Sequence, residues 1–233
     1  MTAPQSPAAL SRRRFLGTAL AGTAATLIGA ASTGFLLPEA AVAQSNLTPD
    51  EALKALLDGN QRYIDGRFKS FDEDKQILRD HTVDKQEPFA AVLSCADSRV
   101  PVEIIFDQSI GHIFVARVAG NIINPEIIGS LEYGAAVLGT KVILVLGHAN
   151  CGAVKAAIQA KAVPGQISSL FPHIQPAVDQ AGPDLTATIK ANATIQATLL
   201  SKASTVLAPM VKEGKLKIVA GYYDLATGKV TLV

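Results

Sequence analysis

The hydrophobic positions in the middle of the chain form short, nearly continuous runs. Such runs occupy residues 89–95 (FAAVLSC), 113–120 (IFVARVAG) and 141–148 (KVILVLGH). Apolar segments of this length, rich in β-branched residues, are typical of strands that are buried on both faces. Residues 216–233 predict a further strand, a turn and a short edge strand, because two apolar stretches there flank a Thr-Gly pair.

Helix-like spacing of apolar residues is found between and around these runs. The segments that carry it are 51–66, 124–139, 151–162 and 184–207. The first has a clear start signal, since Thr48 suits the cap, Pro49 the first helical position and Glu51 a capping box. Strands that alternate with helices predict a single α/β domain. We expect a mostly parallel central β-sheet, with about four strands plus an edge strand, flanked by α-helices.

The first 43 residues have the pattern of an export signal. A basic stretch, SRRRFL at 11–16, precedes a long run of small and apolar residues, and AVAQ at 41–44 offers a cleavage site. The paired arginines resemble the twin-arginine export signal of bacteria. We therefore expect residues 1–43 to be a signal peptide read by the export machinery, and residues 44–233 to be exported to the periplasm or another extracytoplasmic space. If the signal is not cleaved, the apolar run is long enough to anchor the chain in a membrane.

The composition is that of an ordinary globular protein with few candidate catalytic residues. Of its 233 residues, 48% are hydrophobic, which is enough for a sizeable core. The formal net charge is +1 and tryptophan is absent, so no basic surface or stacking platform indicates a nucleic-acid partner. The two cysteines of the chain are therefore the most informative residues.

Both cysteines lie beside charged or metal-binding residues at the ends of predicted strands. CADSRV at 95–100 follows the first apolar run, and GHANCGAV at 147–154 follows the third. Cys95 and His148 are thus placed at the carboxyl ends of central strands, where open α/β sheets build their sites. Cys151 falls at the start of the next helix, whose dipole is expected to lower the pKa of its thiol.

Three interpretations of the cysteines compete. They can be small core residues, but this explains neither the histidine nor the charges beside them. One can be a nucleophile with a histidine base, but that mechanism does not need the second cysteine. In the third, H-x-x-C at a strand-to-helix turn supplies two metal ligands and Cys95 supplies another. Cysteine and histidine together favour zinc, and three protein ligands leave one position open, as in catalytic sites.

The combination of motifs resembles the β-class carbonic anhydrases. C-x-D-S-R precedes H-x-x-C-G by about fifty residues, and the segments around both motifs follow in the family's order. These segments are QEPFAAVLSCADSRVP, GHIFVARVAGNII, GSLEYGAAVLGTKVILVLGHANCGAV and VAGYYDLATGKV. The likeness covers nearly all of residues 44–233, which are therefore expected to be a β-carbonic anhydrase catalytic domain. It implies the reversible hydration of carbon dioxide to bicarbonate and a proton, with one Zn²⁺ per chain.

The resemblance also assigns roles to individual residues. It implies that Cys95, His148 and Cys151 bind the zinc ion, which generates the attacking hydroxide. Asp97 and Arg99 correspond to the family's catalytic dyad. In this dyad the aspartate accepts a hydrogen bond from the hydroxide, and the arginine holds the aspartate through a bidentate contact. Asp97 can also ligate the metal in a closed state that is known in the family.

The resemblance implies a substrate pocket that is built from two chains, and hence a homodimer or a dimer of dimers. The positions that correspond to the family's pocket residues are Gln86, Phe114, Tyr133 and Gly152. Core packing, loop polarity and a helix-start glycine are the alternative explanations of these four residues. The proton shuttle is not identified, and His81, His112 and His173 are candidates by their chemistry alone.

The sequence also departs from the family pattern and leaves other functions open. Arg117 is followed by Val118 rather than asparagine, and Val92 stands where a regulated subgroup has a tryptophan, which favours the open-site subgroup. Carbonyl sulfide and carbon disulfide hydrolases resemble the family and keep the same ligands. A non-catalytic zinc-binding module is a more distant alternative. The Asp97–Arg99 dyad argues against it, because a structural zinc site more commonly has a fourth protein ligand.

Overall fold

The computed structural model describes residues 45–70 and 82–233. The expected signal peptide, residues 1–43, and the candidate proton shuttle His81 lie outside the described residues. Within the described ranges, no helix has both the length and the apolar character needed to cross a membrane.

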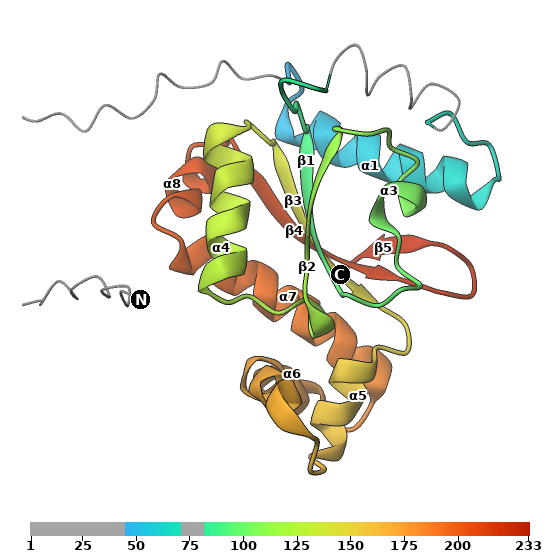
Figure 1. The fold of residues 1–233 in the computed structure, drawn as a ribbon, viewed down its shortest axis with the longest axis vertical. Coiled ribbons are helices and arrows are strands. Elements are labelled where there is room, and N and C mark those ends of the chain that lie inside the picture. The colour runs from blue at the N-terminus through green and yellow to red at the C-terminus, as the bar shows by residue number, and fades with distance from the viewer. Residues whose placement is uncertain (1–44, 71–81) are drawn as a thin grey trace, which may run out of the picture. The chain divides into compact units, whose positions relative to one another are not determined.

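In this described part of the chain, a five-stranded β-sheet forms the centre of the fold (Figure 1). Its strands are β1 (Ala90–Ser94), β2 (Ile113–Arg117), β3 (Val142–His148), β4 (Lys217–Tyr223) and β5 (Val230–Leu232). They lie in the order β2-β1-β3-β4-β5. Strands β1 to β4 run parallel, and β5 pairs antiparallel with β4 at the edge. The prediction of a mostly parallel sheet with an edge strand is therefore confirmed.

Helices cover both faces of the sheet (Figure 1). They are α1 (Pro49–Ile64) and α3 (Val102–Ile105) on one face, and α4 (Pro125–Glu132), α7 (Leu185–Ala203) and α8 (Leu207–Lys212) on the other. Val92 and Leu144 pack in the core on the α1 side, whereas Leu93 and Val145 pack in the core on the α7 side. Successive side chains of a strand point to opposite faces, and here both faces are buried. The central strands are therefore apolar throughout.

The first helix, α1, begins as the sequence predicts and packs closely on the sheet. The Thr48 side chain accepts a hydrogen bond from the Glu51 amide, and the Glu51 carboxylate accepts one from the Thr48 amide, so the capping box is confirmed. Further along α1, a Cβ at Gly59 would lie 1.8 Å from the carbonyl oxygen of Phe106. Glycine at this position lets α1 approach the end of α3 directly.

Two predicted helices are interrupted. The predicted helix 124–139 is α-helical as far as the end of α4 and then forms a π-helical turn, Tyr133–Val137. The predicted helix 184–207 is divided into α7 and α8. Ser204 lies at this break, as the C-cap residue of α7, and its Oγ accepts hydrogen bonds from the amides two and three residues ahead.

A helical lobe extends beyond the sheet, below the strands in Figure 1. It consists of α5 (Gly152–Gln159), the 3₁₀ helix η4 (Gly165–Leu170) and α6 (Phe171–Ala181), and it packs beside α7. The apolar pattern of the sequence does not predict η4 or α6. In α6 only Ile174 and Ala177 are buried, so its apolar stripe is too narrow to stand out before the tertiary contacts are known.

A buried carboxylate joins α1 to the turn after α3. Asp107 is 2% exposed and accepts hydrogen bonds from Arg62 Nε, from the amides of Lys69 and Ser70, and from the Ser70 hydroxyl. Burial by itself raises the pKa of Asp107, but these donors outweigh burial and lower its pKa. The contribution of Asp107 to stability is therefore present above about pH 4, where an unfolded aspartate is ionised, and is lost as the pH falls further.

Replacement of Asp107 by asparagine is expected to lower the free energy of unfolding by about 3 kcal/mol, because it removes the buried carboxylate and leaves the partly buried Arg62 guanidinium without its charged partner. Urea unfolding followed by circular dichroism at neutral pH would measure this loss, and the loss should shrink below about pH 4. Asp58→Asn is the matched control, since Asp58 pairs with Lys54 on the exposed side of α1. Equal losses in the two variants would contradict the prediction.

Candidate metal centre

Three ligand side chains converge at the carboxyl ends of β1 and β3. Cys95 follows the last residue of β1, His148 is the last residue of β3, and Cys151 is the N-cap residue of α5. The two strands pair in parallel, so their carboxyl ends meet at one edge of the sheet. The two sulfur atoms and a ring nitrogen of His148 lie within 4.8 Å of one another, and all three side chains are buried.

The histidine is oriented to bind a metal ion. Its Nδ1 lies 2.9 Å from the carbonyl oxygen of Ala149, and because a carbonyl can only accept, the proton is assigned to Nδ1. Nε2 is buried and has no hydrogen-bond partner among the described residues. An unprotonated Nε2 beside two thiols that form no disulfide fits a cation that prefers nitrogen and sulfur ligands, as zinc does.

The two thiols differ in acidity. The Cys151 thiol donates a hydrogen bond to the Cys95 sulfur, which lowers the pKa of Cys95 to about 4 and raises the pKa of Cys151. Burial adds to the rise at Cys151, and the amides of Val154 and Ala153 at the start of α5 only partly oppose it. The helix start thus acts in the predicted direction at Cys151, but the neighbouring sulfur and burial have the larger effect.

Asp97 and Arg99 form a close ion pair beside the three ligands. Arg99 donates from Nε to Oδ1 at 3.0 Å and from one Nη to Oδ2 at 2.8 Å, and its amide donates to Oδ1 at 2.9 Å. These hydrogen bonds lower the pKa of Asp97, because each favours the charged carboxylate. The guanidinium also donates to the carbonyl oxygen of Asn150 at 3.3 Å. It therefore connects the loop after β1 with the loop that leads to Cys151.

The Asp97 carboxylate faces the ligand group without joining it. Its Oδ2 lies 3.8 Å from Nε2 of His148, and its side chain is 17% exposed. Both carboxylate oxygens accept hydrogen bonds from Arg99, so the carboxylate is held beside the three ligands. The arrangement therefore places a charged acceptor next to the position that a metal ion would occupy.

The sulfur atoms are otherwise surrounded by apolar side chains. Those contributed by α5, α6 and α7 are Val154, Ile174 and Ile189. Gly120, in the loop after β2, has a φ of +78° and donates its amide to Cys95 Sγ at 3.3 Å. A left-handed backbone of this kind favours glycine. Glycine at this position therefore allows the main chain to point its amide at the sulfur and hold it in place. The helical lobe thus shields the ligands from water on one side.

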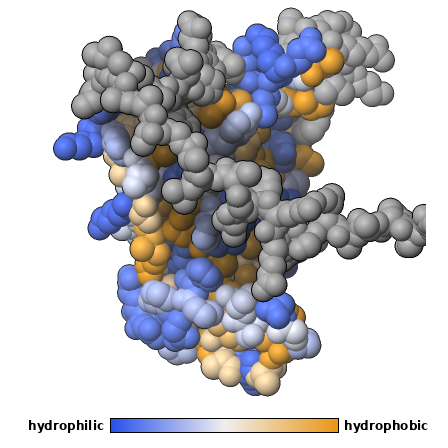
Figure 2. Space-filling view, turned by 60° about the vertical axis from the view of Figure 1, so that its left-hand side comes forward, coloured by the Kyte–Doolittle hydropathy of each residue, from blue (hydrophilic) through white to orange (hydrophobic). Residues whose placement is uncertain are grey.

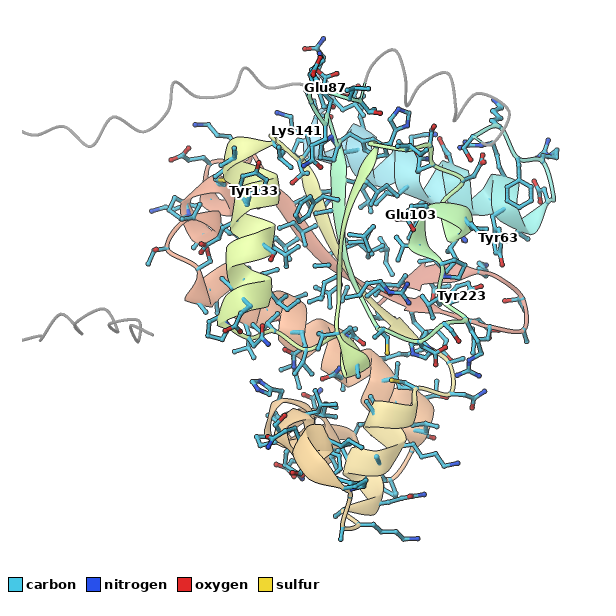
Figure 3. The ribbon with its side chains drawn as sticks, in the orientation of Figure 1. Tyr63, Glu87, Glu103, Tyr133, Lys141 and Tyr223 are labelled. Carbon is cyan, nitrogen blue, oxygen red and sulfur yellow. The ribbon has the colours of Figure 1, made fainter. Side chains whose placement is uncertain are left out.

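Three expected pocket residues lie at the amino ends of the strands, at the opposite end of the sheet from the metal centre. Gln86 precedes β1, and it lines a surface cavity together with Tyr133. The Tyr133 ring lies 6.3 Å from that of Phe114, which pairs with Ala91 near the start of β1. Figure 3 shows Tyr133 at the same end of the sheet as Glu87 and Lys141, which precede β1 and β3. The two ends of the strands are about 15 Å apart, because β1 has five residues and a strand rises about 3.3 Å per residue.

The other expected site residues are placed differently. Gly152 lies directly after Cys151, and a Cβ there would meet no protein atom within 4 Å, so packing within this chain does not require glycine. His112 precedes β2 and so lies at the edge of the sheet away from the ligands. His173 is exposed on α6. The structure therefore brings Gly152 to the metal centre but not His112.

Sequence reasoning missed the part that Arg117 has in this site. Its side chain donates hydrogen bonds to the carbonyl oxygens of Cys95 and Asp97. Its position could have indicated this role, because Arg117 is a charged residue at the end of an apolar strand that lies parallel to β1. The amide of Gly120 was missed for a different reason, since main-chain donors leave no mark on the pattern of residue types. Together, the fold and the site define a zinc-binding α/β enzyme.

Comparison with known proteins gives the family. Residues 90–230 match the family model described as carbonic anhydrase. A carbonic anhydrase of Mycolicibacterium smegmatis is 37% identical over 201 residues, which cover 80% of this chain and 94% of that protein. A Coccomyxa β-carbonic anhydrase, solved in complex with acetazolamide, is 26% identical, with a TM-score of 0.61 over 78% of this chain and 86% of that chain.

A further structural neighbour is one of two tetrameric β-carbonic anhydrases of Sordaria macrospora. Its TM-score is 0.63 and its identity 18%, over 78% of this chain and 97% of that chain. At this identity the likeness concerns the fold alone. The fold is that of the β-carbonic anhydrases, and the chain belongs to the carbonic anhydrase family.

Proposed function

We propose that the protein is a zinc-dependent carbonic anhydrase that catalyses the reversible hydration of carbon dioxide to bicarbonate and a proton. The observation that carries the proposal is the Asp97 carboxylate, which Arg99 holds 3.8 Å from Nε2 of His148. Zinc bound by Cys95, His148 and Cys151 supplies an activated water for attack on carbon dioxide.

The charged dyad orients the attacking water. An ionised carboxylate has about four lone-pair positions, so Asp97 can accept another hydrogen bond in addition to those from Arg99. Asp97 can therefore hold the hydrogen of the attacking water and turn a free lone pair toward the substrate. Arg99 keeps the carboxylate ionised and restrains it from moving into the ligand group. These roles favour an open site, with Asp97 beside the metal ion.

The buried side of the site is apolar. Ile122, Val154, Ile174 and Ile189 share one core cluster with the two cysteines. Because this cluster excludes water, its low dielectric strengthens hydrogen bonds made beside it.

Stopped-flow measurement of carbon dioxide hydration, with zinc counted on the same sample, tests the proposal. We expect rapid turnover with about one zinc ion per chain. Carbonyl sulfide offered to the same sample distinguishes the nearest alternative. Turnover of carbonyl sulfide without turnover of carbon dioxide would assign the site to a sulfur substrate. Bound zinc without turnover of either substrate would indicate a non-catalytic zinc-binding module.

We also propose that Gln86, Phe114 and Tyr133 complete the pocket of a second copy of this chain. They lie together at the edge of the sheet away from the ligands, so they do not reach the metal centre of their own chain. Tyr133 and Val137 are 47% and 39% exposed. Figure 2, turned to bring the α4 side forward, shows apolar residues at the surface in the middle of that face. The structural neighbour from Sordaria macrospora, which shares the fold, is itself tetrameric.

Mixing two defective chains is expected to restore activity if pockets are shared. One chain carries Cys151→Ser and the other Gln86→Ala. A mixed dimer has one pocket in which an intact metal centre meets an intact Gln86. In a random equal mixture about a quarter of all pockets should be of this kind, and carbon dioxide hydration should exceed the mean of the separate variants. Activity equal to that mean would show that each pocket comes from one chain.

We further propose that residues 1–43 direct export through the twin-arginine route to the periplasm. The support is the SRRRFL motif, the apolar run and the AVAQ site. Cell fractionation of a variant with Arg12→Lys and Arg13→Lys should find the protein retained in the cytoplasm. Arg14→Lys is the matched control, and retention of both variants alike would contradict the proposed signal.

A further inference from the structure

Arg117 connects the metal loop to the neighbouring strand. It is the last residue of β2 and lies opposite Ser94, the last residue of β1. After Ser94 the chain leaves the sheet, so the carbonyl groups that follow are no longer paired in the strand ladder. The Arg117 side chain provides donors for two of them. Its Nε donates to the carbonyl oxygen of Cys95 at 2.9 Å, and one Nη donates to that of Asp97 at 2.6 Å.

The two carbonyl groups belong to residues with different tasks in the same reaction. Cys95 supplies a sulfur ligand and Asp97 supplies the carboxylate of the dyad, with only one residue between them. Other restraints act on the loop here. The Val100 amide donates to the Asp97 carbonyl oxygen at 3.1 Å. The Ser94 hydroxyl donates to the Cys95 carbonyl oxygen at 3.4 Å, and the Asp97 amide donates to the Cys95 sulfur. Arg117 is the group that joins both residues to β2. Its loss would let the sulfur and the carboxylate move relative to each other.

The two arginines of the site hold different parts of Asp97. Arg99 binds the carboxylate, whereas Arg117 binds the main chain beneath it. A guanidinium is suited to this second task, because it presents several N–H donors in a fixed plane and reaches two acceptors at once. The ammonium group of a lysine is a compact point charge and would not reproduce the same pair of contacts.

We propose that Arg117 is a positioning residue for carbon dioxide hydration, which sets the Asp97 carboxylate relative to the metal ion that Cys95 binds. The inference rests on the proposed function, because it assigns a role in that reaction. It goes beyond the Asp97–Arg99 dyad, since Arg117 acts only through the main chain of the loop.

The test compares Arg117→Ala and Arg117→Lys with Arg62→Ala in the full chain loaded with zinc. Arg62 is the matched control, because its guanidinium also donates to two acceptors, the carboxylate and the carbonyl oxygen of Asp107, outside the site. We measure kcat and KM for carbon dioxide, urea stability, and the rate at which zinc passes to an excess chelator. In Arg117→Ala we expect kcat to fall about 100-fold with little change in KM. We expect zinc affinity to fall about 10-fold, seen as faster release.

The expected pattern distinguishes positioning from a merely structural role. Arg62→Ala should lose stability with kcat and zinc release unchanged, whereas Arg117→Lys should fold and still show a lowered kcat. If both Arg117 variants keep the wild-type kcat and zinc release, the proposal is overturned. If neither of them folds, Arg117 acts in folding, which overturns it as well. A wild-type protein without carbon dioxide turnover would refute the proposed function, while zinc release would still report whether Arg117 holds the loop.

Discussion

Replacement of Cys151 by serine is expected to remove zinc and abolish carbon dioxide hydration. Serine has nearly the shape of cysteine, but its hydroxyl is a far poorer zinc ligand than a thiolate. Loss of a residue that only hydrogen-bonds to a ligand already weakens metal binding about 10- to 100-fold. Loss of a ligand itself should therefore weaken zinc binding by more than about 100-fold. Zinc content after dialysis against a chelator, together with stopped-flow turnover, measures the effect.

Restoring zinc provides the control for this variant. Wild-type protein stripped by the same chelator should regain both zinc and turnover when zinc is added, whereas the Cys151→Ser variant should not. The wild-type protein should also gain thermal stability from bound zinc, and the variant should not gain it at the same concentration. A Cys151→Ser chain that keeps about one zinc ion through dialysis would contradict the ligand assignment.

Replacement of Asp97 by asparagine is expected to lower kcat/KM for carbon dioxide about 100-fold or more while zinc is retained. The amide has the same shape as the carboxylate, but it is neutral and turns a hydrogen-bond donor toward Arg99 or the attacking water. It therefore loses both the pairing with Arg99 and the acceptor that orients the water. Stopped-flow kinetics and zinc content on one sample measure the two effects separately.

The chain itself offers a matched control for this substitution. Asp65 and Arg67 form an ion pair with the same spacing, but they lie just after α1, away from the ligands. Asp65→Asn should leave kcat/KM unchanged. An Asp97→Asn variant as active as Asp65→Asn would remove the dyad from the mechanism. Loss of zinc from the Asp97 variant would instead assign that residue to metal binding.

The sequence by itself determined the class of fold and the place of the metal centre. Strands buried on both faces are apolar throughout, so the segments around Val92 and Leu144 were readable as the centre of a parallel sheet. The carboxyl ends of parallel neighbouring strands meet at one edge. Cys95 and His148 could therefore be expected to lie together although fifty-two residues intervene in the chain.

Only the tertiary structure decided the features that depend on distances between segments. The direction of the Cys151 pKa shift followed from the nearby Cys95 sulfur and from burial, which local helix position does not reveal. The placement of Tyr133 away from the ligands followed from the lengths and directions of β1 and β2. The two hydrogen bonds that Arg117 donates are accepted by main-chain carbonyl groups, which every residue carries. Their pairing is therefore settled by the geometry of the chain and not by the order of its side chains.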